Sequence, residues 1–404
     1  MKIRSITCFA ELSQSQNAPL IQQLAEAAQA ARQALQEVGY EVQSTRLASQ
    51  PFSNLIEGLD NNQVSALAHS IEADTLSAGF GYLSLGPVLA GQIEQLKLIA
   101  PILSQTQASF LSMQLVAKDG FFDPAFFIAC AKVIRQVATL EPNGFANLKL
   151  AALANVAPGS PFFPAAYHAG GQPAFAFAPQ AADLAVQAFL GAESIAEASL
   201  ALTKTIENHS QKLETIGAEI EKQHGIEFLG IDFSMAPYPS DKESLGKAIE
   251  EMGVPQVGLQ GSLTAAAILT SAIQQAQFKR TGFNGLLMPP LEDAVLAQRT
   301  AQGVLGIQDL LLYSAVCGTG IDTLALPGDA SEAALAAILM DLAALATRLD
   351  KPLTARLLPI PGKKPGDETD FDFEFFANSR VIALEGQGLQ PPLSNSPPFK
   401  LLQR

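Results

Sequence analysis

The sequence predicts an α/β fold with about ten strands, most of them parallel. Two observations predict it. Strand-like and helix-like segments alternate along almost the whole chain of 404 residues, and parallel strands need helical crossovers between them. Hydrophobic residues make up 48% of the chain and charged residues only 16%, which suits a large buried core. We therefore predict one domain over residues 1–385 and a Pro-rich tail over residues 386–404.

The predicted strands are short apolar or alternating segments, most of them bounded by turn residues. In the first of them, strict alternation places Ile3, Ser5, Thr7 and Phe9 on one face and Arg4, Ile6 and Cys8 on the other. Strands are predicted at Lys2–Phe9, Tyr40–Leu47, Phe80–Leu85, Phe110–Val116, Leu148–Val156, Ala174–Ala178, Ile226–Phe233, Gly285–Met288, Thr323–Leu326, Leu353–Pro359 and Ser379–Leu384.

The predicted helices have apolar residues at helical spacing and recognisable ends. Gly39 stops the first helix, and Asp123 followed by Pro124 starts the fourth. Glu193–His224 is the longest and carries its charges on one side, so we expect it to offer a surface for a second copy of the chain. The helices are Pro19–Val38, Gln63–Glu72, Val88–Leu103, Pro124–Leu140, Ala181–Leu190, Glu193–His224, Lys242–Met252, Ser262–Phe278, Glu292–Leu305, Ile307–Val316 and Ser331–Leu349.

Composition narrows the partners and the compartment. The net charge of −14 disfavours nucleic acid, because an acidic surface repels phosphate backbones. The three cysteines are far apart and form no CxxC pair, which favours a reducing compartment and disfavours a structural zinc site. The most apolar helix, near Ala333–Ala346, is interrupted by Asp341 and is too short to cross a bilayer. We expect a cytoplasmic protein that binds a small molecule, without a membrane or nucleic-acid partner.

The first candidate site is the segment YSAVCGTGIDTLALPGD, which joins two apolar helical patterns. Cys317 is a candidate nucleophile or radical carrier, although a buried small apolar residue is the structural alternative. Asp322 is the stronger catalytic or metal-binding candidate, because it lies at a loop-to-strand edge beside flexible backbone. Backbone N–H groups could bind an anion at Gly318, Thr319 and Gly320.

Two further clusters follow predicted strands, where ligands bind in α/β proteins. The loop APGSPFFPAAYHAGG contains Tyr167, a ligand-binding candidate, and His168, a candidate base or metal ligand. Its structural alternative is a histidine that is hydrogen-bonded within the loop. Asp232 and Ser234 end the strand before a Pro-rich exit. A carboxylate there suits a metal or a substrate hydroxyl, or it caps the next turn.

The last candidates are Glu292, Asp293 and Arg356. Glu292 is a candidate general base or metal ligand, which makes Asp232, Glu292 and Asp322 the predicted metal set. The helix dipole alone explains Asp293. Arg356 is informative because basic residues are scarce, and a carboxylate or phosphate ligand needs such a group.

Several of these segments together resemble an uncharacterised bacterial and archaeal family called domain of unknown function 711, or UPF0210. The matching strings are SPFFPAAYH, IDFSMAPYP, TGFNGLLMPPLED, YSAVCGTGIDTLALPGD and PLTARLLPIPGKKPGD. The resemblance implies a fold akin to pyruvate formate-lyase, a closed ten-stranded α/β barrel with an inner loop. It places Cys317 where radical enzymes of that fold carry a loop cysteine. Arg380-Val381 is followed by Ile382-Ala383 and not by Gly-Tyr, so no glycyl radical is expected.

The function remains open between classes at this point. One hypothesis is an enzyme that acts on a small polar metabolite inside the barrel, with a divalent metal as the possible cofactor. The alternative is a non-catalytic sensor or binding protein that uses the same cavity. A thiol-radical enzyme is the third and weakest hypothesis, because the radical glycine is missing.

Overall fold

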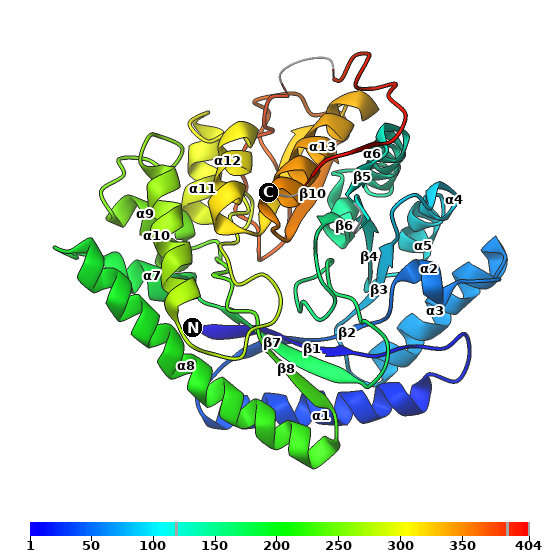
Figure 1. The fold of residues 1–404 in the computed structure, drawn as a ribbon, viewed down its shortest axis with the longest axis horizontal. Coiled ribbons are helices and arrows are strands. Elements are labelled where there is room, and N and C mark those ends of the chain that lie inside the picture. Colours follow the sequence, from blue (N-terminus) through cyan, green and yellow to red (C-terminus); the bar gives the residue numbers. More distant parts are fainter. Residues whose placement is uncertain (118–119, 385–387, 403–404) are drawn as a thin grey trace.

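A nine-stranded sheet organises the protein in the computed structural model, which describes residues 1–117, 120–384 and 388–402. Its strand order is β8-β7-β1-β2-β3-β4-β6-β10-β9. The sheet curves around the centre of the molecule, and the helices cover its outer face (Figure 1). The strands are β1 (Lys2–Phe9), β2 (Val42–Ala48), β3 (Tyr82–Val88), β4 (Ser109–Gln114), β6 (Leu150–Ala154), β7 (Ala174–Gln180), β8 (Glu227–Ile231), β9 (Gly320–Pro327) and β10 (Leu353–Ile360).

The strands run in two opposite directions, which corrects the prediction of a mostly parallel arrangement. β1, β2, β3, β4 and β6 are parallel to one another. β7 pairs antiparallel with β1, and β10 pairs antiparallel with β6. β8 is parallel to β7, and β9 is parallel to β10. The carboxyl ends of the two sets therefore lie at opposite edges of the sheet.

The predicted closed ten-stranded barrel is wrong, because the sheet has nine strands and does not close on itself. The segment Gly285–Met288, predicted as a strand, makes only an isolated bridge from Leu286 to Met235. Gly282 and Asn284, just before this segment, have φ angles of +72° and +50°, so the chain enters it from a turn and not from extended backbone. Ser379–Leu384 likewise contributes a single bridge, between Arg380 and Glu368, and no strand.

The helices agree with the predicted order, with shifted ends. The predicted helix Val88–Leu103 is two short helices, since Val88 ends β3 and Gly91 has a φ of +83°. α8 is the longest, at 30 residues; its use as a surface for a second copy stays a prediction. The main helices are α1 (Ala18–Glu37), α3 (Asn61–Ser77), α4 (Ile93–Leu96), α5 (Ile99–Gln105), α6 (Pro124–Ala138), α7 (Ala182–Phe189), α8 (Ile195–His224), α9 (Leu245–Glu251), α10 (Ser262–Gln275), α11 (Ala294–Ala301), α12 (Ile307–Cys317) and α13 (Glu332–Leu349).

Successive side chains of a strand point to opposite faces of the sheet. Leu47, Leu83 and Leu111 point outward into the large core beneath the helices. The inner face carries small side chains such as Thr7 and Ser84 beside large ones such as Phe110. Residues 157–171, which follow β6, lie against the small ones. Thr7 donates a hydrogen bond to the carbonyl of Pro161, and Ser84 to that of Ala166.

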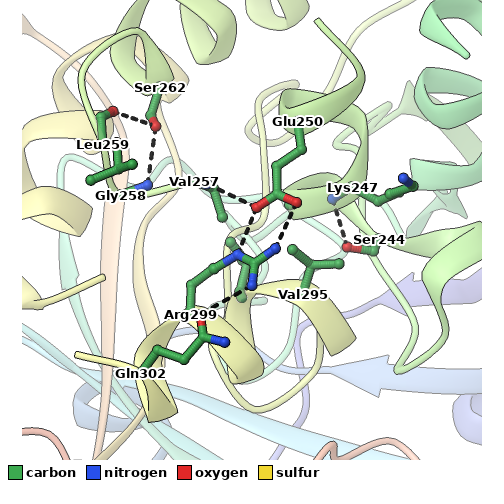
Figure 2. Close-up of polar contacts among 12 residues, drawn as sticks. Ser244, Lys247, Glu250, Val257, Gly258, Leu259, Ser262, Val295, Arg299 and Gln302 are labelled. Atoms are coloured by element: carbon green, nitrogen blue, oxygen red, sulfur yellow. Dashed lines mark hydrogen bonds and ion pairs between the residues drawn. The ribbon is translucent and has the colours of Figure 1, made fainter. Parts of the chain in front are cut away.

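An ion pair between Glu250 of α9 and Arg299 of α11 ties these two helices together (Figure 2). Arg299 donates from Nε at 2.7 Å and from Nη2 at 2.9 Å to the two oxygens of the carboxylate. Glu250 also accepts a hydrogen bond from the backbone of Val257, and Arg299 also donates one to Gln302. The cluster therefore fixes helix packing and leaves no free charge for a ligand.

The tail packs back on the body in part, where β11 (Phe399–Lys400) pairs with β5 (Phe121–Phe122). The predicted boundary after residue 385 lies outside the described residues. Among the helices of the described ranges, none is both long and apolar enough to pass through a bilayer.

Candidate functional site

A cavity of about 290 Å³ opens on the inner side of the curved sheet. It is lined by residues at the start of β2, β3, β4 and β6, by Gln180 at the end of β7, and by the turn after β8. Because the strands run in two directions, the amino ends of some strands and the carboxyl end of β7 meet at this cavity. Seven of its lining residues are aromatic: Tyr82, Phe110, Phe145, Phe163, Tyr238, Phe373 and Phe375.

One wall of the cavity is a buried chain of alternating charges. Arg356 donates through Nε and Nη2 to both oxygens of Asp322, the latter at 2.7 Å. Nη2 also donates to Glu292 at 2.8 Å, and the second oxygen of Glu292 accepts from Arg4 at 3.1 Å. Burial alone would lower the pKa of Arg356, but Asp322 and Glu292 outweigh it and raise the pKa above its ordinary value. Arg356 is thus a permanent cation.

Two β-bulges direct these charged side chains into the interior. β1 carries one extra residue opposite β7 between Ile3 and Ser5, and that residue is Arg4. The bulge moves Ile3 to the outer core, so the strict alternation predicted for this strand is wrong at its start. β9 also carries an extra residue opposite β10, next to Asp322. Bulges re-aim side chains in this way beside functional sites.

The backbone at the second bulge is unusual. Thr323 has a φ of +45°, which is rare for a β-branched residue, and its buried hydroxyl has no hydrogen-bond partner among the described residues. Such strain persists only where the surroundings enforce it. It coincides here with the turn of the chain that brings Asp322 to Arg356.

Arg46 is, like Lys149, a cation of the cavity without a carboxylate partner in the described residues. Its Nε donates to Ser44 at 2.9 Å, and its guanidinium lies 5.8 Å from the Tyr82 ring and 5.2 Å from the Phe163 ring. Burial, together with the positive charge of Arg4, lowers the pKa of Arg46 to about 9. The Arg46 side chain is partly exposed, and an anion beside its guanidinium would favour the charged form.

The charges around the cavity do not cancel. Arg4, Arg46, Lys149 and Arg356 supply four positive charges. Glu292 supplies one negative charge and Asp322, bonded to Arg356, a second, which leaves a net charge of +2. Over the described residues, the ion pairs of this group involve only Arg4 and Arg356. A positive cavity in a chain of net charge −14 is the electrostatic environment of an anion site.

His168 and Tyr167 lie elsewhere, beyond the carboxyl ends of β2 and β6. The backbone N–H of His168 donates to Ser49, and Tyr167 Oη donates to Val156 at 2.8 Å. Both imidazole nitrogens are occupied: Nδ1 accepts from Gly170 and Nε2 faces the carbonyl of Gln172. Burial lowers the pKa of His168, although the bond to Gln172 opposes the shift. This geometry matches the structural alternative for the histidine.

Asp232 and Ser234 form a buried turn beside the cavity. The Asp232 carboxylate accepts from Ser234 Oγ at 2.6 Å and from the backbone N–H groups of Phe283 and Asn284. Burial raises the pKa of Asp232, and these hydrogen bonds only partly oppose the rise. Asp232 therefore holds the segment after Gly282 in place, and it makes no contact with Glu292 or Asp322.

The predicted metal set is not brought together as a group. Glu292 and Asp322 share Arg356, and Asp232 has its own partners. Within residues 1–117, 120–384 and 388–402, no three His, Cys, Asp or Glu side chains are arranged to hold a metal ion.

Cys317 is the last residue of α12 and does not line the cavity. Its sulfur lies 3.7 Å from Thr319 Oγ1, and the Thr319 hydroxyl donates to the carbonyl of Leu286. Gly318 ends the helix with a φ of +74°. At Gly320 a Cβ would lie 2.1 Å from the carbonyl oxygen of Thr354, so glycine permits the close approach of β9 and β10. The inner segment of the fold is the loop after β6, and not the turn that carries Cys317.

Three residues that line the cavity were not predicted from the sequence: Arg4, Arg46 and Lys149. One signal in the sequence pointed to them. Burying a lone arginine in a strand of small residues costs free energy unless its charge is paired or binds a ligand. Candidates were sought beyond the carboxyl ends of parallel strands. Arg46 lies within β2, so it was not among them.

The chain belongs to the family described as Uncharacterised ACR (DUF711), which matches residues 1–378. A UPF0210 protein of Pyrobaculum arsenaticum is 30% identical over 370 residues, which cover 84% of this chain and 78% of the relative. A UPF0210 protein of Acetivibrio thermocellus is 28% identical, over 83% of this chain and 78% of its own length. A third, of Methanosarcina acetivorans, is 27% identical over 82% and 75%.

Proposed function

We propose that this protein binds a small organic acid in the cavity beside Arg46. The observation that carries the proposal is the Arg46 guanidinium, which faces the cavity without an ion pair from any described residue. Arg4 and Arg356 are already neutralised by Glu292 and Asp322. The unpaired charges of Arg46 and Lys149 are therefore left for a ligand.

Binding without turnover is the better supported of the two functions left open by the sequence. Acid–base catalysis by either candidate, Glu292 or His168, needs a side chain that is free to exchange a proton. Glu292 is the carboxylate that lines the cavity, and two arginines hold both of its oxygens. His168 has no access to the cavity. The proposal includes a cytoplasmic location, which three buried free cysteines support.

Replacing Arg46 by Gln is expected to weaken the binding of a small carboxylate such as benzoate by about 10- to 100-fold. The reason is the loss of a charge-assisted hydrogen bond, worth about 1.5–3 kcal/mol. Isothermal titration calorimetry measures the affinities. The variant should fold, because no described carboxylate loses its partner when Arg46 is removed.

Arg135→Gln is the matched control, since this exposed arginine lies on α6 and does not line the cavity. It should bind carboxylate as the unmodified protein does. Equal affinities of Arg46→Gln and Arg135→Gln would show that the anion binds elsewhere, and the proposal would be abandoned.

The affinity for a carboxylate is also expected to fall as the pH rises through about 9. The charged form of Arg46 binds the anion, and its pKa in the ligand-free protein is about 9. Below that pH the guanidinium is charged and the affinity is full; above it, binding must also take up a proton. Calorimetry at several pH values on both sides of 9 checks this. An affinity that stays constant up to about pH 11 would show that the guanidinium stays charged throughout, and would contradict the lowered pKa of Arg46.

A further inference from the structure

We infer that the ligand is an aromatic carboxylate, whose flat ring lies against the aromatic walls of the cavity. This inference rests on the proposed function and specifies the class of acid. Aromatic residues make up 7% of the chain, yet seven of the nineteen residues that line the cavity are aromatic. Such an enrichment, at a site that also carries unpaired positive charge, indicates recognition of a ring that bears an anionic group.

The first wall surrounds the cation. The Phe110 ring meets the Tyr82 and Phe163 rings edge to face, each at a centroid distance of 5.4 Å. Arg46 lies over the rings of Tyr82 and Phe163. Because rings cover the guanidinium, its N–H edge is the part left for a ligand, and that edge matches a carboxylate in two parallel hydrogen bonds.

The second wall comes from the FDFEFF segment that follows β10. Phe371 and Phe376 are buried and anchor this segment, whereas Phe373 and Phe375 line the cavity. Phe373 meets Phe145 at 5.1 Å and Phe375 at 5.3 Å, and Tyr238 meets the Phe375 ring at 5.9 Å. The wall thus combines rings from three separate parts of the chain.

The volume of the cavity favours a compact ligand. Its volume of about 290 Å³ lies at the lower limit of ligand pockets, which range from about 300 to 1,000 Å³. A carboxylate conjugated to a ring is planar, so the plane that pairs with the guanidinium edge continues into the ring. Saturated rings of the same size are puckered and lack the quadrupole that edge-to-face contacts use.

Benzoate and cyclohexanecarboxylate test the inference, since they share a charge and a ring size and differ in aromaticity. Calorimetry on the full chain should give benzoate the tighter binding, by about 2- to 10-fold. Phe373→Leu keeps the apolar bulk and should reduce this preference to about 1-fold, as should Phe375→Leu if the first variant does not fold. The control Phe278→Leu, outside the cavity, should keep the preference.

The outcomes separate the two proposals. Equal binding of both acids, lost together in Arg46→Gln, overturns the aromatic inference and leaves the anion site standing. A benzoate preference that survives both Phe373→Leu and Phe375→Leu also overturns it. If neither acid binds at millimolar concentration, both proposals fail.

Discussion

Replacing Asp322 by Ala is expected to lower the free energy of unfolding by about 3–5 kcal/mol, because it leaves a buried guanidinium with one of its two carboxylate partners. The side chains of Asp322 and Arg356 are only 6% and 4% exposed. Asp322 accepts two of the hydrogen bonds that Arg356 donates, and Glu292 accepts a third. Chemical denaturation followed by circular dichroism measures the change.

Two controls make the Asp322 experiment specific. Glu94→Ala removes an exposed ion pair to Lys97 and should cost less than about 1 kcal/mol. Adding Arg356→Met to Asp322→Ala should restore part of the lost stability, because the unpaired charge is removed with it. A double variant no more stable than Asp322→Ala would show that the loss comes from packing and not from the stranded charge.

Replacing Asp293 by Ala is expected to cost about 2–4 kcal/mol, because this buried carboxylate caps two helices at once. It accepts from the backbone of Val295 and Leu296 at the start of α11. It also accepts from Ser244 Oγ at 2.6 Å and from the backbone of Leu245 and Gly246 at the start of α9. Urea denaturation measures the loss.

Asp123→Ala is the matched control for the Asp293 experiment. Asp123 caps α6 alone, through one hydrogen bond from the backbone of Ala125, so its removal should cost about 1 kcal/mol. Equal losses for the two variants would contradict the double-capping role. Asp293→Asn should fall between them, since an amide keeps one acceptor oxygen.

The sequence predicts the order of helices and strands because local patterns carry that information. Asp123-Pro124 starts α6 as predicted. Asp293, which the sequence explained by the helix dipole alone, is the residue that caps α11. Strand direction is different, because it depends on how distant segments pair. Nothing in the local pattern of Ala174–Gln180 distinguishes its antiparallel pairing with β1 from a parallel one. The predictions of a parallel, closed barrel were wrong for this reason.

Part of the candidate site could be predicted, namely charged residues that stand near predicted strands and loops in a chain with few charges. Glu292, Asp322 and Arg356 were chosen from the sequence, and the fold joins all three in one chain of hydrogen bonds. Arg46 was not predicted, because its position in the cavity depends on the bulges and on the rings of Tyr82 and Phe163, which come from other parts of the chain. For His168 the structure shows the hydrogen-bonded geometry of the structural alternative, and the bonds that occupy its ring cannot be read from the sequence.

A crystal structure of the protein soaked with bromobenzoate tests the central claim most directly, because the anomalous signal of bromine locates the ligand. We predict bromine within the cavity that Phe373 and Phe375 line, and the carboxylate within hydrogen-bond distance of Arg46. Bromine found only outside this cavity, or a protein carboxylate paired with Arg46, would contradict the claim that this guanidinium is kept free for an anion.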